Sequence, residues 1–212
     1  IDLVTEAAER EIPPAAVAGM PVILGVDVAR FGDDRSVITR RQGLSTAKPE
    51  VFTGLDTMAL ADQLMDRMRR YNPAAVFVDA GAMGAGVIDR CRQMGFTNVS
   101  EVPFGGSAID KERYANIRAE MYFKAKEYLE QGGSLPQEPD LKSELSSIEY
   151  KFTRAGKIIL QPKEEIKELT GKSPDLADSF VLTFARPVNV ASKVAQRRAE
   201  RENALYDPLA GM

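Results

Sequence analysis

The chain has 212 residues, of which 44% are hydrophobic and 28% charged, with a formal net charge of −3. This composition is typical of globular proteins, and because no apolar run approaches the roughly 18 residues of a membrane span, we expect no membrane partner. The absence of histidine excludes Ser-His-Asp and Cys-His catalytic sites and zinc sites built on imidazole. Hydrolytic chemistry would therefore depend on carboxylates, lysine, tyrosine, serine or a metal ion.

The N-terminal segment differs in composition from the rest of the chain. Residues 1–20 combine a short helical pattern with prolines and small residues, which predicts a linker from an upstream domain. The chain begins with Ile1 rather than methionine, so we expect a fragment of a longer protein. Its single cysteine, Cys91, excludes an intrachain disulfide and indicates a reducing compartment.

Strands and helices alternate in the predicted core domain, residues 21–187. Short apolar runs predict strands at 22–27 and 75–79, and segments between turn residues predict further strands at 36–41, 50–53 and 99–102. Apolar residues at helical spacing predict helices at 58–71, 86–94, 113–130, 141–148 and 163–169. A hairpin is expected from 149–153 and 157–160. This order predicts an α/β fold in which helices cover a sheet that has parallel members.

The last core helix has a marked beginning at Ser173-Pro174-Asp175. Serine is a favoured N-cap and proline is favoured in the first turn, so we expect Ser173 to cap this helix. After Pro187 the composition becomes polar, and residues 188–212 are predicted to form a C-terminal tail.

Three aspartates lie at the ends of core elements. Asp27 and Asp79 each end an apolar strand, and Asp178 shares the apolar face of the last helix. Parallel strands gather their carboxyl ends at one edge of a sheet, where ligands bind in open α/β folds. A strand-terminal aspartate that only begins a turn is the alternative. Because a carboxylate beside a core is costly unless paired or bound to a cation, the pattern predicts one divalent-metal site.

Such a site would suit phosphodiester hydrolysis. Two cations roughly 3.5–4 Å apart can activate the attacking water and stabilise the leaving oxygen without histidine. Further residues could belong to this site, but each also has an explanation that needs no role in catalysis. Asp33 and Asp34 form a turn after the first strand, Asp175 satisfies a helix dipole, and Arg30 belongs to a charged edge strand or contacts a DNA backbone. Lys172 is a candidate phosphate contact.

Four sequence motifs follow one another along the chain in an order that is found in a known protein family. Residues 22–34 form a strand ending in Asp27 and an acidic turn, 76–79 precede a glycine-rich turn, 116–120 open a helix and 173–179 read Ser-Pro-Asp-Leu-Ala-Asp-Ser. This set, which spans roughly residues 21–187, resembles the nuclease domain of the large terminase subunit of tailed double-stranded DNA bacteriophages.

The resemblance implies a ribonuclease-H-like fold with a mixed five-stranded, or slightly larger, sheet flanked by helices. It also implies an endonuclease that cuts concatemeric double-stranded DNA during packaging, with little sequence specificity. Asp27, Asp79 and Asp178 would be its catalytic, metal-binding carboxylates, with Asp33 as a supplementary ligand and two Mg²⁺ or Mn²⁺ ions per site.

The same resemblance implies partners and a location. The partners are double-stranded DNA, an upstream ATPase domain of the same polypeptide, a portal protein and a small terminase subunit, in the host cytoplasm during virion assembly. No Walker-type sequence is present, so no ATPase site is expected within this chain.

Two other readings stay open. One is a nucleotide-binding lobe of the actin-like or sugar-kinase type, although such proteins usually need two lobes and this length supplies one. The other is a mainly structural module that docks on a portal protein through its basic tail, residues 193–201.

Overall fold

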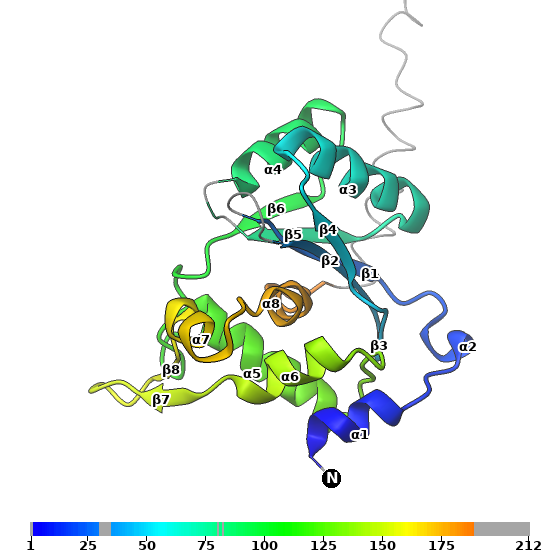
Figure 1. Cartoon of the computed structure of the whole chain (residues 1–212). Coiled ribbons are helices and arrows are strands. Elements are labelled where there is room, and N and C mark those ends of the chain that lie inside the picture. The colour runs from blue at the N-terminus through cyan, green and yellow to red at the C-terminus, as the bar shows by residue number, and fades with distance from the viewer. Residues whose placement is uncertain (1, 30–34, 80, 82, 189–212) are drawn as a thin grey trace, which may run out of the picture.

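A mixed six-stranded sheet forms the centre of the chain (Figure 1). The computed structural model describes residues 2–29, 35–79, 81 and 83–188. The strands are β1 (Val22–Asp27), β2 (Arg35–Gln42), β3 (Ser45–Thr46), β4 (Glu50–Thr53), β5 (Ala75–Asp79) and β6 (Val99–Val102). Their order is β3-β2-β1-β5-β6, and β4 also pairs with β2. β1 is antiparallel to β2 and parallel to β5, and β5 is parallel to β6.

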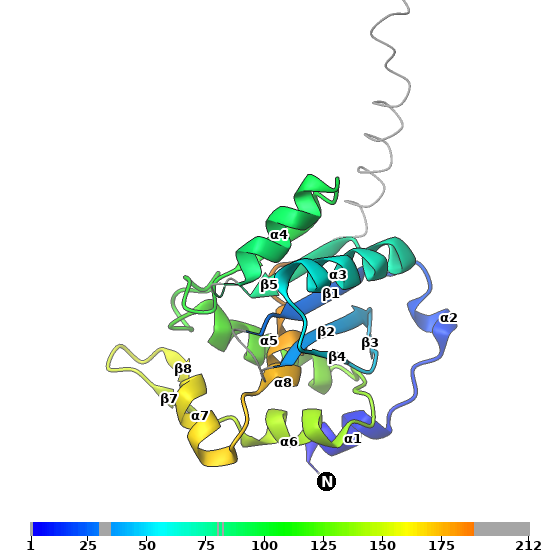
Figure 2. The same ribbon diagram turned by 45° about the horizontal axis from the view of Figure 1, so that its top comes forward.

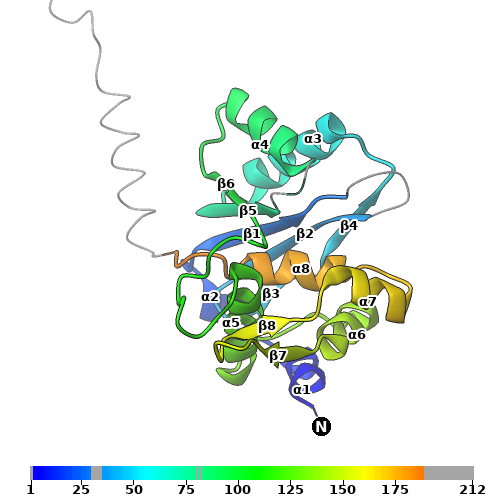
Figure 3. The same cartoon turned by 90° about the vertical axis from the view of Figure 1, so that its left-hand side faces the viewer.

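Helices cover both faces of this sheet. One face carries α3 (Thr57–Tyr71) and α4 (Gly84–Gln93), and the other carries α8 (Asp175–Leu182), which lies directly against the strands (Figure 3). Behind α8 lie α5 (Ile117–Glu130) and α6 (Pro139–Ser147). A hairpin of β7 (Tyr150–Phe152) and β8 (Ile158–Leu160) projects from the body beside α7 (Lys163–Thr170) (Figures 1 and 2).

The alternation of side chains along β1 and β5 decides where their last residues point. In β1, Leu24 and Val26 join the core under α3 and α4, whereas Ile23 joins the core on the α8 side. In β5, Val78 faces α3 and α4, and Phe77 faces α8. Because successive side chains point to opposite faces, the aspartates that end both strands point toward the α8 face.

A close backbone contact lets α8 reach these aspartates. Gly25 faces α8, and a Cβ atom built on it would lie 2.1 Å from the carbonyl oxygen of Ser179 and 3.0 Å from Cβ of Leu182. Only glycine permits this approach between a central strand and a helix. The contact brings the first turn of α8, and therefore Asp178, next to the end of β1.

We expect Gly25→Ala to lower the free energy of unfolding by about 3 kcal/mol, because the added methyl group must push α8 away from the sheet. Gly105→Ala is the matched control, since nothing lies within 4 Å of the Cβ position at Gly105. Urea unfolding of both variants measures the difference. Equal stability of the two would show that α8 does not depend on this close approach.

The N-terminal segment packs on the domain. α1 (Leu3–Glu9) buries Ala7 and Ala8 against the α5 and α6 region, and the Leu135 amide donates to the Ala7 carbonyl at 2.9 Å. Arg10 donates to the carbonyls of Leu129 and Gly133. A second short helix, α2 (Pro14–Val17), leads to β1. The division into residues 1–20, 21–187 and 188–212 stays a prediction.

The predicted elements are found in the predicted order, and most of their ends lie within two residues of the predicted bounds. The α5 helix begins at Ile117 rather than near 113, because the Asn116 side chain accepts from the Ala119 amide at 2.9 Å and sets the N-terminus. The N-cap of α8 is Pro174 and not Ser173, and it makes no side-chain capping bond. Neither the two-residue strand β3 nor the short helix α2 was expected.

No helix in the described ranges has the length and apolar character needed to cross a membrane.

Candidate functional site

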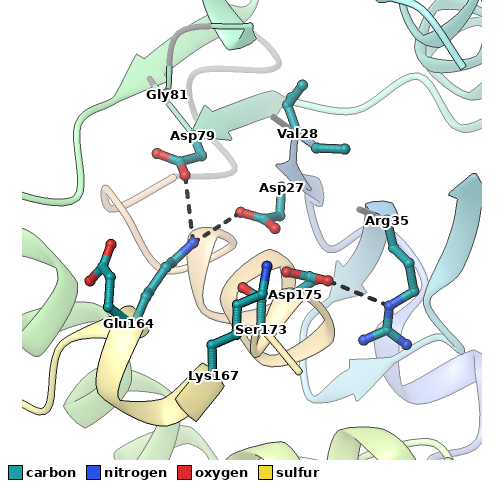
Figure 4. Close-up of a pocket in the computed structure, with 11 residues that line it drawn as sticks. Asp27, Val28, Arg35, Asp79, Gly81, Glu164, Lys167, Ser173 and Asp175 are labelled. Atoms are coloured by element: carbon teal, nitrogen blue, oxygen red, sulfur yellow. Dashed lines mark hydrogen bonds and ion pairs between the residues drawn. The ribbon is translucent and has the colours of Figure 1, made fainter. Parts of the chain in front are cut away.

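The three aspartates expected to form one site meet around a single cation. Nζ of Lys163 lies 2.7 Å from Oδ2 of Asp178, 3.4 Å from Oδ1 of Asp27 and 3.7 Å from Oδ2 of Asp79. The contacts of Asp27 and Asp79 are drawn in Figure 4. Three carboxylates that are distant along the chain therefore line one small space at the carboxyl edge of β1 and β5.

The helix α7 places this lysine. Lys163 is its first residue, directly after Pro162, which follows the hairpin, and the ammonium also lies 4.6 Å from the centre of the Phe104 ring. The apolar spacing predicts this helix but gives Lys163 no role. No spacing or periodicity relates it to the three aspartates, so sequence patterns contain no signal for it.

Asp178 is the most enclosed of the three carboxylates, with no exposed surface. Tyr122 donates its hydroxyl to Oδ1 at 2.8 Å, and Nε of Arg118 lies 3.4 Å from the same oxygen. Both side chains come from α5, four residues apart, and therefore from one face of that helix. The sequence patterns gave these two residues no role, although they lie in or near the motif that opens α5.

The surroundings move the pKa values of Asp27 and Asp178 in opposite directions. Burial raises the pKa of Asp27 well above its ordinary value, and the Lys163 cation only partly offsets this. Burial also opposes ionisation of Asp178, but the cations of Lys163 and Arg118 outweigh it and hold the pKa of Asp178 below its ordinary value. Burial disfavours the Lys163 cation, yet the carboxylates raise its pKa above the ordinary value.

An open cavity of about 250 Å³ lies beside this cluster. Arg35 forms part of its wall and holds Asp175, with Nε 3.4 Å from Oδ2, and its Nη2 lies 3.2 Å from Oε1 of Glu144. Burial raises the pKa of Glu144 to about 7. The residues that line the cavity are Asp27, Val28, Ala29, Arg35, Asp79, Gly81, Lys163, Glu164, Lys167, Ser173 and Asp175 (Figure 4).

Comparison with protein-family models and with curated protein sequences finds no match. Solved structures do match. The nuclease domain of the large terminase subunit gp2 of bacterial virus Sf6 aligns with a TM-score of 0.70 and 20% identity, over 79% of this chain and 89% of that domain. The large terminase nuclease from thermophilic phage G20c aligns with a TM-score of 0.60 and 17% identity, over 79% and 82%.

This chain has the fold of a phage terminase nuclease domain. The likeness confirms the resemblance seen in the sequence and the predicted ribonuclease-H-like α/β class. Structures of the two related domains have also been solved with metal ions, a variant of the Sf6 domain with manganese and the G20c domain with bound magnesium.

Two further residues predicted near the site, Asp175 and Lys172, are described by the structure. Asp175 lines the cavity and pairs with Arg35, and its role as a supporting group at the site stays a prediction. Lys172 lies at the surface, with Nζ 4.0 Å from Oδ2 of Asp140, and its role as a phosphate contact stays a prediction. The predictions for Arg30, Asp33 and Asp34 lie outside the described residues.

The chemistry of the cluster suits a divalent cation. As they stand, the described residues contain no group of three or more acidic or cysteine side chains with the geometry of a metal site. The Lys163 ammonium, itself a cation, fills the space on which the carboxylates converge. Oδ2 of Asp178 is buried and makes no hydrogen bond within the described residues, although it pairs with Lys163. Carboxylate oxygens are the ligands that Mg²⁺ and Mn²⁺ prefer.

Proposed function

We propose that this chain is a metal-dependent endonuclease that cuts double-stranded DNA during the packaging of a viral genome. One observation carries the proposal: Asp27, Asp79 and Asp178 converge on one cation, beside an open cavity, on the fold shared with terminase nuclease domains. If Asp27 and Asp79 only began turns, they would not be expected to share a centre with Asp178.

Each residue has a distinct task in this proposal. Asp27, Asp79 and Asp178 would hold the divalent ions, Mg²⁺ or Mn²⁺, with two ions per site. Bound there, such ions would supply Lewis-acid activation of water and neutralise charge on the leaving oxygen. Asp33 is proposed as a supplementary ligand. Tyr122 and Arg118 hold Asp178 in place.

The cavity beside the carboxylates is where the DNA backbone would lie. Lys167 lines it one turn of α7 beyond Lys163, and Arg35 lines it from β2, so cations flank the acidic cluster. A chain of net charge −3 has little general attraction for DNA. We therefore propose that much of the affinity for DNA comes from an upstream ATPase domain, and that a portal protein and a small terminase subunit direct the complex during assembly.

The proposal is tested by incubating the purified chain with supercoiled plasmid and Mg²⁺ or Mn²⁺. We expect nicked and linear DNA to appear without ATP, and EDTA to prevent it. Plasmids of unrelated sequence should be cut at similar rates, because the proposed chemistry acts on the phosphate backbone, which is the same in every sequence. If cleavage is absent with every divalent ion at protein concentrations well above that of the DNA, the isolated chain is not an autonomous endonuclease.

A further inference from the structure

Two donors from α5 converge on one oxygen of Asp178. Oδ1 accepts the Tyr122 hydroxyl at 2.8 Å and lies 3.4 Å from Nε of Arg118. Oδ2 is buried, and its contact within the described residues is the ion pair with the Lys163 ammonium at 2.7 Å. The two oxygens of this carboxylate are thus held in different ways, one by the scaffold and the other by the cation at the site.

The two donors are themselves fixed. Nη1 of Arg118 donates to the Gln161 carbonyl at 3.0 Å, and its guanidinium lies 5.4 Å from the centre of the Tyr122 ring. Arg118 is 7% exposed and Tyr122 is 9% exposed, so neither has room to take another rotamer without repacking. Gln161 lies two residues before Lys163. Arg118 therefore links the backbone next to Lys163 with Asp178, the carboxylate that Lys163 contacts.

The α5 donors and the cation at the site engage different oxygens of Asp178. Both α5 donors bind Oδ1, which can accept two hydrogen bonds. Within the described residues no scaffold donor reaches the buried Oδ2, and its contact is the ion pair with Lys163. A divalent ion that took the place of the ammonium would therefore meet Oδ2 and not Oδ1.

We propose that Tyr122 and Arg118 are positioning residues that engage Oδ1 and so make Asp178 present a single oxygen, Oδ2, to a bound divalent ion. The inference rests on the proposed function, because it concerns the same ion site. Groups that orient a metal ligand in this way are worth roughly 10–100-fold in metal affinity or activity.

The test compares two tyrosines of the same helix. Tyr122→Phe removes only the hydroxyl that holds Asp178. Tyr128→Phe is the matched control, because its hydroxyl is also buried and hydrogen-bonded, to Thr46 at 2.9 Å and to the Ser134 carbonyl at 3.1 Å, away from the site. Mn²⁺ binding to the metal-free chain is measured by titration calorimetry. We expect Tyr122→Phe to bind Mn²⁺ about tenfold more weakly than wild type and Tyr128→Phe to bind like wild type.

Cleavage kinetics give a second readout. A positioning role predicts that Tyr122→Phe lowers kcat at saturating Mn²⁺ and leaves KM for DNA unchanged. Equal Mn²⁺ affinity in Tyr122→Phe, Tyr128→Phe and wild type would overturn the inference and leave the proposed function standing. If the wild-type chain itself binds no Mn²⁺, the proposed function fails and the inference fails with it.

A second variant covers the case in which Tyr122→Phe does not fold. Arg118→Lys keeps the positive charge but cannot keep the contacts of both Nε and Nη1. We expect its Mn²⁺ affinity to fall about tenfold as well. Because lysine keeps the positive charge beside Asp178, a loss of Mn²⁺ affinity would come from a changed orientation of the Asp178 carboxylate. An unchanged Mn²⁺ affinity would argue against a positioning role for Arg118.

Discussion

Replacing Asp27 or Asp79 with asparagine is expected to reduce metal-dependent plasmid cleavage by more than about 100-fold. Loss of a group that only orients a metal ligand already costs roughly 10–100-fold in activity, and loss of the ligand itself should cost more. An amide has the shape of the carboxylate but lacks the negative charge that a divalent ion requires. The same loss is expected for Asp178→Asn. Initial nicking rates at saturating Mn²⁺ measure the effect.

Asp89→Asn is the control for these variants, because Asp89 is an exposed aspartate on α4, on the other face of the sheet. It should cut at the wild-type rate. If any one of the three site variants retained full cleavage, that residue would have no part in the mechanism. Retained cleavage in all three would remove the acidic cluster from the chemistry altogether.

The same variants should differ in stability when no metal is present. The pKa of Asp27 is raised in the folded chain, so the stability linked to this group is present below its ordinary pKa and is lost as the pH rises through the raised value. The pKa of Asp178 is lowered, so its contribution is present above its ordinary pKa and is lost as the pH falls through the lowered value.

At a pH above the raised pKa of Asp27, Asp27→Asn should therefore melt at or above the wild-type temperature. Asp178→Asn should melt lower and lose about 3–5 kcal/mol, the usual cost of removing one partner from a buried ion pair. If repulsion among the three carboxylates were the dominant effect instead, both variants would be more stable than wild type. Thermal unfolding in EDTA distinguishes the cases, and a destabilised Asp27→Asn would give that aspartate a structural role.

The second large effect concerns the lysine within the cluster. Lys163→Met should raise the affinity of the chain for Mn²⁺ more than about tenfold, because the ammonium and the metal ion compete for the same three carboxylates. The competing charge lies 2.7–3.7 Å from their oxygens, and a tenfold change requires only about 1.4 kcal/mol. Titration calorimetry with Mn²⁺ measures the change.

Without metal, Lys163→Met should also be less stable than wild type. The raised pKa of Lys163 means that its contribution is fully present below the ordinary pKa of lysine, and therefore at neutral pH. Added Mn²⁺ should raise the melting temperature of this variant more than that of wild type. Lys151→Met, at an exposed hairpin position, is the control. Unchanged Mn²⁺ affinity in Lys163→Met would mean that the lysine and the ion do not share a position.

Local patterns were sufficient to predict much of this fold. The strands 22–27 and 75–79 were predicted at their observed bounds, because short apolar runs between turn residues have few alternatives. The parallel pairing of β1 and β5 follows from alternating strands and helices, and it explains why Asp27 and Asp79 could be placed at one edge. Asp178 could be added because the apolar residues Val181 and Leu182 follow it at helical spacing.

The rest of the site depends on tertiary contacts that no local pattern encodes. Lys163 reaches the aspartates only because the hairpin and α7 fold back over the carboxyl edge of the sheet. Tyr122 and Arg118 lie on a buried face of α5 among apolar neighbours, where a sequence pattern indicates core packing. The Gly25 contact with α8 likewise joins residues more than 150 positions apart along the chain.

The most direct measurement is the anomalous scattering of crystals soaked in Mn²⁺. We expect density peaks between the carboxylates of Asp27, Asp79 and Asp178, with Oδ2 of Asp178 as the coordinating oxygen and the Lys163 ammonium moved away. Fully occupied Mn²⁺ sites elsewhere on the chain, with Lys163 still inside the acidic cluster, would contradict the proposed metal site.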